Sequence, residues 1–168
     1  MRHAFLNSNV QVPLNTPGSA TTSTINSDWV GLEHGTCAAF MIIIEEGRAN
    51  QADDNTLTFR QATDAAGASV KEFVPRRAYR RAHATNIASA AAAKREEIDS
   101  DDMHIDGDMH TIYEVEIDAS ELDVNNDFTH LQAGTSQVGG STTKVTITAT
   151  VADLRHKMDP VYLPNVLE

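Results

Sequence analysis

Hydrophobic and polar side chains alternate along several short stretches of this chain, a period that is typical of β-strands with one buried face. Three stretches show the alternation most clearly: residues 55–61, 111–118 and 143–154. The side chains expected to face inward are Leu57, Phe59, Tyr113, Val115, Ile117, Val145, Ile147, Ala149 and Val151. The pattern therefore predicts several half-buried strands.

The strongest core signal is the continuous apolar run from Ala38 to Ile44, which follows Trp29-Val30-Gly31-Leu32. A short run that contains three successive isoleucines predicts a strand buried on both faces, because β-branched side chains lose rotamer freedom in a helix. Cys37, next to this run, is expected to be a small core residue. The aromatic side chains expected in the core are Trp29, Phe40, Phe59, Tyr113 and Phe128.

Further strands are expected at 69–74, where Pro75 ends the run, and at 128–133. Residues 63–68 and Gly139-Gly140 have the composition of turns, and 119–124 that of a single helical turn. In total, the sequence predicts seven or eight short strands separated by turns. This spacing predicts a mainly β fold, an antiparallel β-sandwich of jelly-roll-like or similar wiring, rather than a βαβ scheme.

The chain divides into three parts by composition. Residues 1–28 are polar and predict an extended N-terminal arm, 29–154 form the sandwich domain, and 155–168 predict an extended C-terminal tail. Within the domain, 76–110 is an insertion. Its alanine-rich part, 76–98, has high helix propensity and predicts a surface helix or a partly ordered excursion, and its remainder predicts an acidic loop.

Composition narrows the function classes. The 168 residues carry a formal net charge of −11, which argues against nucleic acid as the main partner because phosphates require clustered cations. Val, Ile, Leu and Phe together make up about a fifth of the chain, so the core is lean and gains stability by docking on something larger. No apolar run is long enough for a membrane span or a signal peptide. The chain has one cysteine and can form no intrachain disulfide.

The most metal-like segment places His104, Asp106, Asp108 and His110 at alternate positions. In an extended chain these four side chains point to one side, where carboxylate oxygens and imidazole nitrogens could hold a divalent ion. Neighbouring side chains of this set would lie about 6–7 Å apart, which is awkward for chelation. A solvated acidic loop is the favoured interpretation, and no metal or other cofactor is expected.

A basic cluster consists of Arg76, Arg77, Arg80 and Arg81. At helical spacing these side chains would share one side of a helix. Guanidinium groups bind carboxylates in pairs, so the cluster is a candidate for binding an acidic partner surface. Internal pairing with the acidic run 96–108 is the other main interpretation, and nucleic-acid binding the weakest.

Catalytic signatures are absent from the sequence. No serine lies in a Gly-x-Ser-x-Gly turn, and no glycine-rich phosphate loop occurs. Glu114 and Glu116 share one strand face and are most simply exposed to solvent. The sequence therefore predicts a protein that is not an enzyme.

The order of these segments resembles a known family. A polar lead runs into Trp29-Val30-Gly31-Leu32 and the apolar strand, then come Thr56 to Gly67, Tyr113 to Asp118 and Ala119 to His130, and last a Thr-rich strand. This organisation resembles the small β-rich structural proteins of tailed-bacteriophage virions. The resemblance covers about 29–75 and 111–152 and lies in the style and order of segments, while the insertion at 76–110 departs from it.

The resemblance implies a non-enzymatic head decoration, or cement, protein that stabilises the capsid shell. The implied partners are the major capsid protein and copies of the chain itself, as a homo-oligomer for which a trimer is favoured over a dimer. The implied location is the virion, assembled in the host cytoplasm. Two alternatives stay open: a neck or tail component such as a tail terminator, tube or connector, and a jelly-roll module that binds carbohydrate or calcium.

Overall fold

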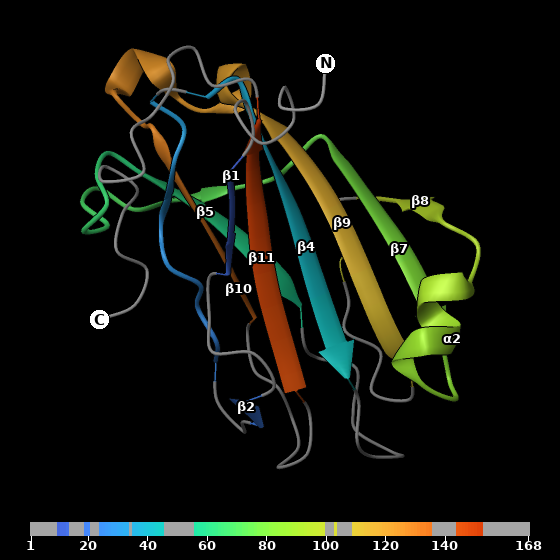
Figure 1. The fold of residues 1–168 in the computed structure, drawn as a ribbon. Helices are drawn as coiled ribbons and strands as arrows, with labels where there is room; N and C mark the ends of the chain where they lie inside the picture. Colours follow the sequence, from blue (N-terminus) through green and yellow to red (C-terminus); the bar gives the residue numbers. More distant parts are fainter. Residues whose placement is uncertain are drawn as a thin grey trace.

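Short antiparallel strands build this protein, seen in a computed structural model, into two sheets (Figure 1). The structure describes residues 10–13, 19–20, 24–33, 35–45, 56–99, 103, 109–135 and 144–152. The strands are β1 (Val10–Pro13), β2 (Ser19–Ala20), β3 (Val30–Gly31), β4 (Cys37–Glu45), β5 (Leu57–Ala62), β6 (Lys71–Phe73), β7 (Arg77–His83), β8 (Glu96–Ile98), β9 (His110–Asp118), β10 (His130–Thr135) and β11 (Lys144–Ala152). Helix α2 (Ile87–Ala92) and the 3-10 turns η1 (Ala119–Glu121) and η2 (Val124–Asn126) complete the described chain.

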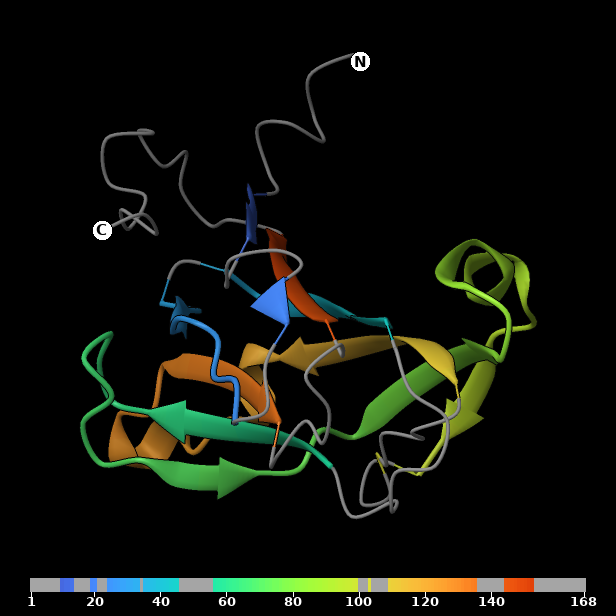
Figure 2. The same ribbon diagram turned by 90° about the horizontal axis from the view of Figure 1, so that it is seen from below.

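The two sheets form two layers. The larger sheet has the strand order β1-β11-β4-β9-β7-β8, with β2 also paired to β11, and the smaller has the order β3-β10-β5-β6. The view from below shows β11, β4 and β9 in one layer and β10, β5 and β6 in the other (Figure 2). The mainly β, sandwich architecture with a small helical insertion is therefore confirmed, and the strand order supplies the wiring that the sequence left open.

Alternation along the strands puts one apolar face of each sheet into the core. Phe40 of β4 meets Phe59 of β5 across the sandwich, edge to face, with ring centroids 5.4 Å apart. Tyr113 is the largest fully buried side chain. The inward side chains predicted for the three alternating stretches are all buried: Leu57, Phe59, Tyr113, Val115, Ile117, Val145, Ile147, Ala149 and Val151.

Strand β4 lies in the middle of the larger sheet, but only one of its faces is fully buried. Ala38, Phe40, Ile42 and Ile44 are buried, whereas Met41 is 37% exposed and the other outward side chains of β4 are half-buried. The expectation of burial on both faces is therefore wrong. No described strand stacks on this side of the sheet, so the outward side chains of the apolar run, Cys37 included, lie at the surface.

Residues 77–83 form strand β7, not the helix that their propensity predicts. Ala78 is fully buried in the core, and β7 pairs with β9 over its whole length. Tertiary pairing has overridden a weak local preference, as it commonly does where a segment can complete a sheet. Within the described part of the insertion the helical element is the short helix α2, which begins after Asn86. Asn86 Oδ1 accepts a hydrogen bond from the Ser89 N–H.

Trp29 is half-buried and lies outside the core, contrary to expectation. It packs beside the 63–68 turn, where Asp64 Oδ1 accepts hydrogen bonds from the Ala66 and Ala68 N–H groups. The other four predicted core aromatics, Phe40, Phe59, Tyr113 and Phe128, are buried.

The N-terminal part of the chain pairs with its own sheet where it is described. β1 and β2 both lie antiparallel to β11. Residues 24–32 run beside β10, where the Ser27 N–H donates to the Ala133 carbonyl at 2.8 Å and the Leu32 N–H to the Thr129 carbonyl at 2.8 Å. The predicted tail 155–168 lies outside the described residues, as does most of the acidic loop.

Candidate interaction surface

The four arginines of the basic cluster do not share one side of a helix. Because β7 is a strand, Arg77 and Arg81 stand on its outer face with Tyr79, whereas Arg80 lies on the same side as the buried Ala78. Arg76 precedes the strand. The single basic patch expected from helical spacing is therefore split between two faces.

Arg81 is committed to contacts within the chain. Its Nη2 lies 3.1 Å from Glu114 Oε1 on β9, and its Nη1 donates a hydrogen bond of 3.0 Å to the Ala91 carbonyl at the end of α2. Arg95 reaches the same carboxylate, with Nε 2.7 Å from Glu114 Oε2, and its guanidinium lies 3.7 Å from the centre of the Tyr79 ring. These contacts hold α2 and the chain after it against β7 and β9, so Arg81 is not available to a partner.

The remaining arginines of the cluster are less engaged. The Arg76 backbone N–H donates to Glu121 Oε2 at 3.2 Å, while its guanidinium Nε lies 3.8 Å from the same atom and its side chain is 76% exposed. Arg77 is exposed and Arg80 half-buried, and neither has an ion pair within the described chain. The ion pairs of Arg76 and Arg81 among the described residues are with Glu121 and Glu114, and most of the acidic run 96–108 lies outside the described residues.

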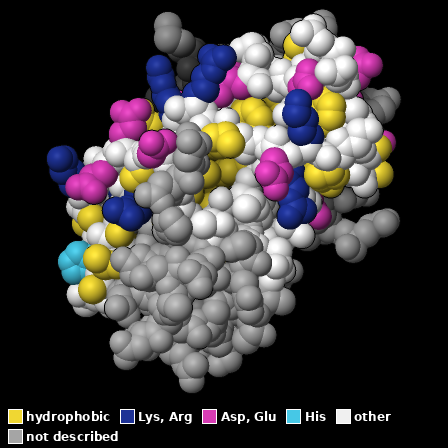
Figure 3. Space-filling model, turned by 180° about the vertical axis from the view of Figure 1, so that it is seen from behind, with side chains coloured by type: hydrophobic (Ala, Val, Ile, Leu, Met, Phe, Trp, Pro, Cys, Tyr) yellow, Lys and Arg dark blue, Asp and Glu magenta, His cyan; other side chains and the backbone are white. Residues whose placement is uncertain are grey.

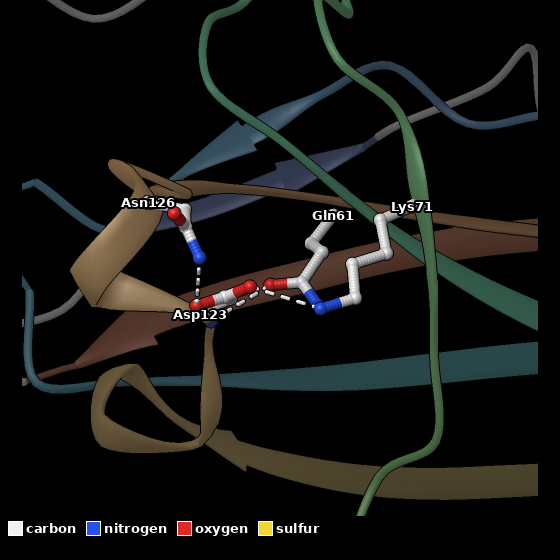
Figure 4. A network of polar contacts seen from close by, with 4 residues as sticks. All are labelled: Gln61, Lys71, Asp123 and Asn126. Carbon is white, nitrogen blue, oxygen red and sulfur yellow. Dashed lines mark hydrogen bonds and ion pairs between the residues drawn. The ribbon is translucent and has the colours of Figure 1, made fainter.

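A second polar cluster joins η2 to the smaller sheet (Figure 4). Asp123 Oδ2 accepts from Lys71 Nζ at 2.9 Å, Asp123 Oδ1 accepts from Asn126 Nδ2 at 2.9 Å, and the Asp123 N–H donates to Gln61 Oε1 at 2.9 Å. The bonds from Lys71 and Asn126 hold the pKa of Asp123 below its ordinary value. This cluster was not anticipated from the sequence, since its hydrogen-bonded partners lie as far as 62 residues apart in the chain.

The predicted metal ligands are placed only in part. His104, Asp106 and Asp108 lie outside the described residues. His110 begins β9 directly opposite His83 of β7, and its buried Nδ1 has no hydrogen-bond partner. Among the residues that the structure describes, no group of three or more His, Cys, Asp or Glu side chains is placed to hold a metal ion.

His130 is a buried histidine on β10. Its Nδ1 lies 2.9 Å from Thr129 Oγ1, and its ring lies over Gly31, where an added Cβ would stand 3.1 Å from Nε2. Burial lowers the pKa of His130 below 6.5, because desolvation disfavours the imidazolium, and the charges of Glu33 and Asp64 oppose this shift. The arrangement is that of a packed, neutral side chain.

The two sides of the sandwich differ in surface chemistry. On the described part of the side seen in Figure 3, acidic and basic side chains are interspersed with small separate hydrophobic areas. On the opposite side, the outward side chains of β4 form a continuous apolar column, Ala39, Met41 and Ile43, in the middle of the larger sheet. The sequence predicts these side chains in the interior, whereas Met41 is 37% exposed and Ala39 and Ile43 are half-buried. None of the helices in the described chain is long and apolar enough to cross a membrane.

Comparisons with known proteins include a weak similarity to a solved structure. No protein-family model matches the chain, and no curated protein matches it. A solved structure, that of the SPBc2 prophage-derived protein YomS, is similar over 85% of this chain and 91% of its own, with 10% sequence identity and a TM-score of 0.40. At that TM-score the function has to be argued from the chain's own residues.

Proposed function

We propose that this protein is a non-enzymatic structural component of a virion, which decorates and stabilises a capsid shell through protein–protein contacts. The observation that carries the proposal is the apolar column on the outer face of β4. In an antiparallel sheet with one face in water, outward positions are normally polar. The side chains that depart from this rule lie at the centre of a broad sheet, where a protein partner would cover them.

Two further features support a role in assembly. The sequence resembles small virion structural proteins in the order of its segments, which favours a shell as the partner. Arg76 and Arg77 are exposed cations at one end of β7, next to the outer face. An acidic surface on the major capsid protein would complement them. Contacts with neighbouring subunits are proposed for 1–9 and 155–168, since residues 10–13 and 19–20 of the expected arm 1–28 pair with β11 of their own chain. The assembly is proposed to be a homo-oligomer, for which the family resemblance favours a trimer over a dimer.

The direct test is binding of the purified chain to shells assembled from the major capsid protein alone. We expect co-sedimentation with the shells and an increase in their resistance to heat. A chain without residues 1–9, a deletion that keeps β1 and β2, should bind more weakly. Shells that neither bind the protein nor change in heat resistance would contradict the proposal.

A charge-reversal variant tests the ionic part of the contact. Arg77→Glu should weaken attachment and flatten its dependence on salt, because it removes a cation from the interface. Lys94→Glu is the matched control, since Lys94 is an exposed cation beyond the end of α2. Equal effects of the two variants would mean that attachment responds to net charge rather than to this end of β7.

Copy number in a purified particle separates decoration from the neck and tail alternative. Hundreds of copies on the head are expected for a decoration protein, and about six or twelve for a ring at the neck. Calorimetry with calcium, zinc and simple sugars tests the carbohydrate or calcium module, for which binding heat is expected only if that alternative holds.

A further inference from the structure

The outer face of the larger sheet is ordered into columns of different chemistry. Strand register places Thr146, Thr148 and Thr150 of β11 on one side of the apolar column of β4. Glu114, Glu116 and Asp118 of β9 stand on its other side. From β11 to β9 the face therefore presents hydroxyl groups, then apolar groups, then carboxylates.

The described elements of the chain leave the centre of this face uncovered. Helix α2 lies against β7 and β9, at the lower right in Figure 1, and the ribbon shows no described element in front of β4 and β11. Met41 remains 37% exposed in the middle of the column. Contact between this apolar column and water is unfavourable, so covering the column with another protein surface would stabilise the complex.

The charges of this face suit a second copy of the chain. With a net charge of −11, two copies repel each other over most of their surfaces. Most carboxylates of this face have a cation beside them. Glu45 pairs with Lys144, Glu114 pairs with Arg81 and Arg95, and Glu116 lies opposite Arg77 in the strand register. Two copies that meet through this face avoid most of the repulsion.

The order of the columns selects one of two symmetric arrangements. A two-fold axis parallel to β4 stacks the apolar column on its own copy and brings the threonines of β11 over the carboxylates of β9 in the partner, donors over acceptors. A two-fold axis perpendicular to the strands brings carboxylates over carboxylates. The first arrangement satisfies the polar groups and the second leaves like charges facing each other.

The free part of the face supplies a share of a dimer interface. At about 3.3 Å per residue and about 4.8 Å between strands, the three strands β11, β4 and β9 span roughly 30 Å by about 14 Å, and β7 is left out because α2 lies against it. A standard interface takes about 800 Å² of accessible surface from each partner, so these strands supply roughly half of it and contacts at their margins would supply the rest.

We infer that the outer face of β11, β4 and β9 is a self-association surface on which a second copy of this chain packs face to face, about a two-fold axis parallel to β4. The inference shares the apolar column of β4 with the proposed shell-binding role, but ultracentrifugation of the purified chain tests self-association without a shell, so the two proposals can fail separately. It differs from the trimer that the family resemblance implies, because an interface of this symmetry closes as a pair.

Analytical ultracentrifugation of the full chain over a concentration series tests the inference. We expect a species of twice the 18.2 kDa chain mass. Met41→Glu, which places a carboxylate in the apolar column, should weaken the dimer by about 100-fold or more. Val74→Glu is the matched control, because Val74 is 59% exposed beside β6 in the other sheet, and should leave the dimer unchanged. A monomer or trimer for the natural chain, or a dimer insensitive to Met41→Glu, would overturn the inference.

Charge exchange tests the orientation and does not depend on Met41. Thr150→Glu should weaken the dimer, because the carboxylate that it introduces would face the partner's Glu116. Adding Glu116→Thr restores the alternation of donors and carboxylates and should recover at least part of the affinity. Glu116→Thr alone separates the two axes. With the axis parallel to β4 it removes an acceptor that faces the partner's Thr150 and should weaken the dimer, whereas with the axis perpendicular to the strands it removes a pair of repelling carboxylates and should strengthen the dimer. A strengthened dimer would overturn the proposed geometry.

The single cysteine gives an independent readout. Cys37 lies on the outer side of β4, in line with the apolar column, and is half-buried. A two-fold axis parallel to β4 brings Cys37 over its own copy at the spacing of stacked sheets, about 10 Å. A short bismaleimide should therefore link two natural chains at Cys37, and the link should be lost in Met41→Glu. Failure of cross-linking in a sample that is dimeric by ultracentrifugation would overturn the inference.

Discussion

The indole ring of Trp29 lies against Gly67 so closely that a Cβ atom on that glycine would stand 2.7 Å from Trp29 Nε1. Gly67 also has φ +77°, a left-handed conformation that an L side chain adopts only at a cost. The turn at 63–68 is therefore fixed by two requirements that only glycine meets together.

Gly67→Ala should lower the free energy of unfolding by about 1–2 kcal/mol from the backbone conformation alone, and further because Trp29 must move. Urea denaturation measures the change. Gly31→Ala is the matched control: its Cβ would stand 3.1 Å from His130 Nε2, and its φ is not left-handed, so the loss should be smaller. Equal losses would contradict the role assigned to the turn.

Gln61→Leu should destabilise the chain by about 1–3 kcal/mol, because it removes the acceptor of the Asp123 N–H while keeping a side chain of similar volume. Gln61 is only 4% exposed, so water is poorly placed to replace the lost bond. Asn126→Ala removes an exposed hydrogen bond to the same aspartate and should cost less. Denaturant titration of both variants measures the two losses in free energy of unfolding. A larger loss for Asn126→Ala than for Gln61→Leu would contradict the prediction.

Arg81→Met should loosen helix α2. The substitution removes the bond to the Ala91 carbonyl and one of the two guanidinium contacts of Glu114. Amide hydrogen exchange in residues 87–92 should quicken, with a loss of about 1 kcal/mol in global stability at most. Arg80→Met, on the other face of β7, should leave exchange in α2 unchanged, and similar exchange in both variants would refute the anchoring role.

His130 should make the fold sensitive to mild acid. Its pKa is lowered by burial in the folded chain, so between pH 6.5 and that lowered pKa the unfolded chain binds a proton that the folded chain does not. The contribution of neutral His130 is therefore fully present above pH 6.5 and is lost as the pH falls below it. Denaturant titrations from about pH 8 to about pH 5 measure the free energy of unfolding. This free energy should fall less with decreasing pH in His130→Gln than in the natural chain. An equal fall in both would argue against a role of His130 in the acid sensitivity.

The sequence by itself determined the strands with clear alternation. The alternate side chains of these strands face the core as predicted, because a period of two has one interpretation when one face is apolar and the other polar. They are Leu57, Phe59, Tyr113, Val115, Ile117, Val145, Ile147, Ala149 and Val151. The sandwich class followed from the spacing of these strands. The short helical turn at 119–124 also lies close to its expected place.

Only the tertiary structure decided what the less patterned segments do. Residues 77–83 became a strand because pairing with β9 buries Ala78, a gain that alanine-rich helix propensity cannot match. The cluster around Asp123 depends on partners far apart in the chain, which no local pattern reveals. The apolar run of β4 predicts a strand but not which of its faces is buried. Burial of each face depends on which elements stack on the sheet, and within the described chain the smaller sheet covers only one side.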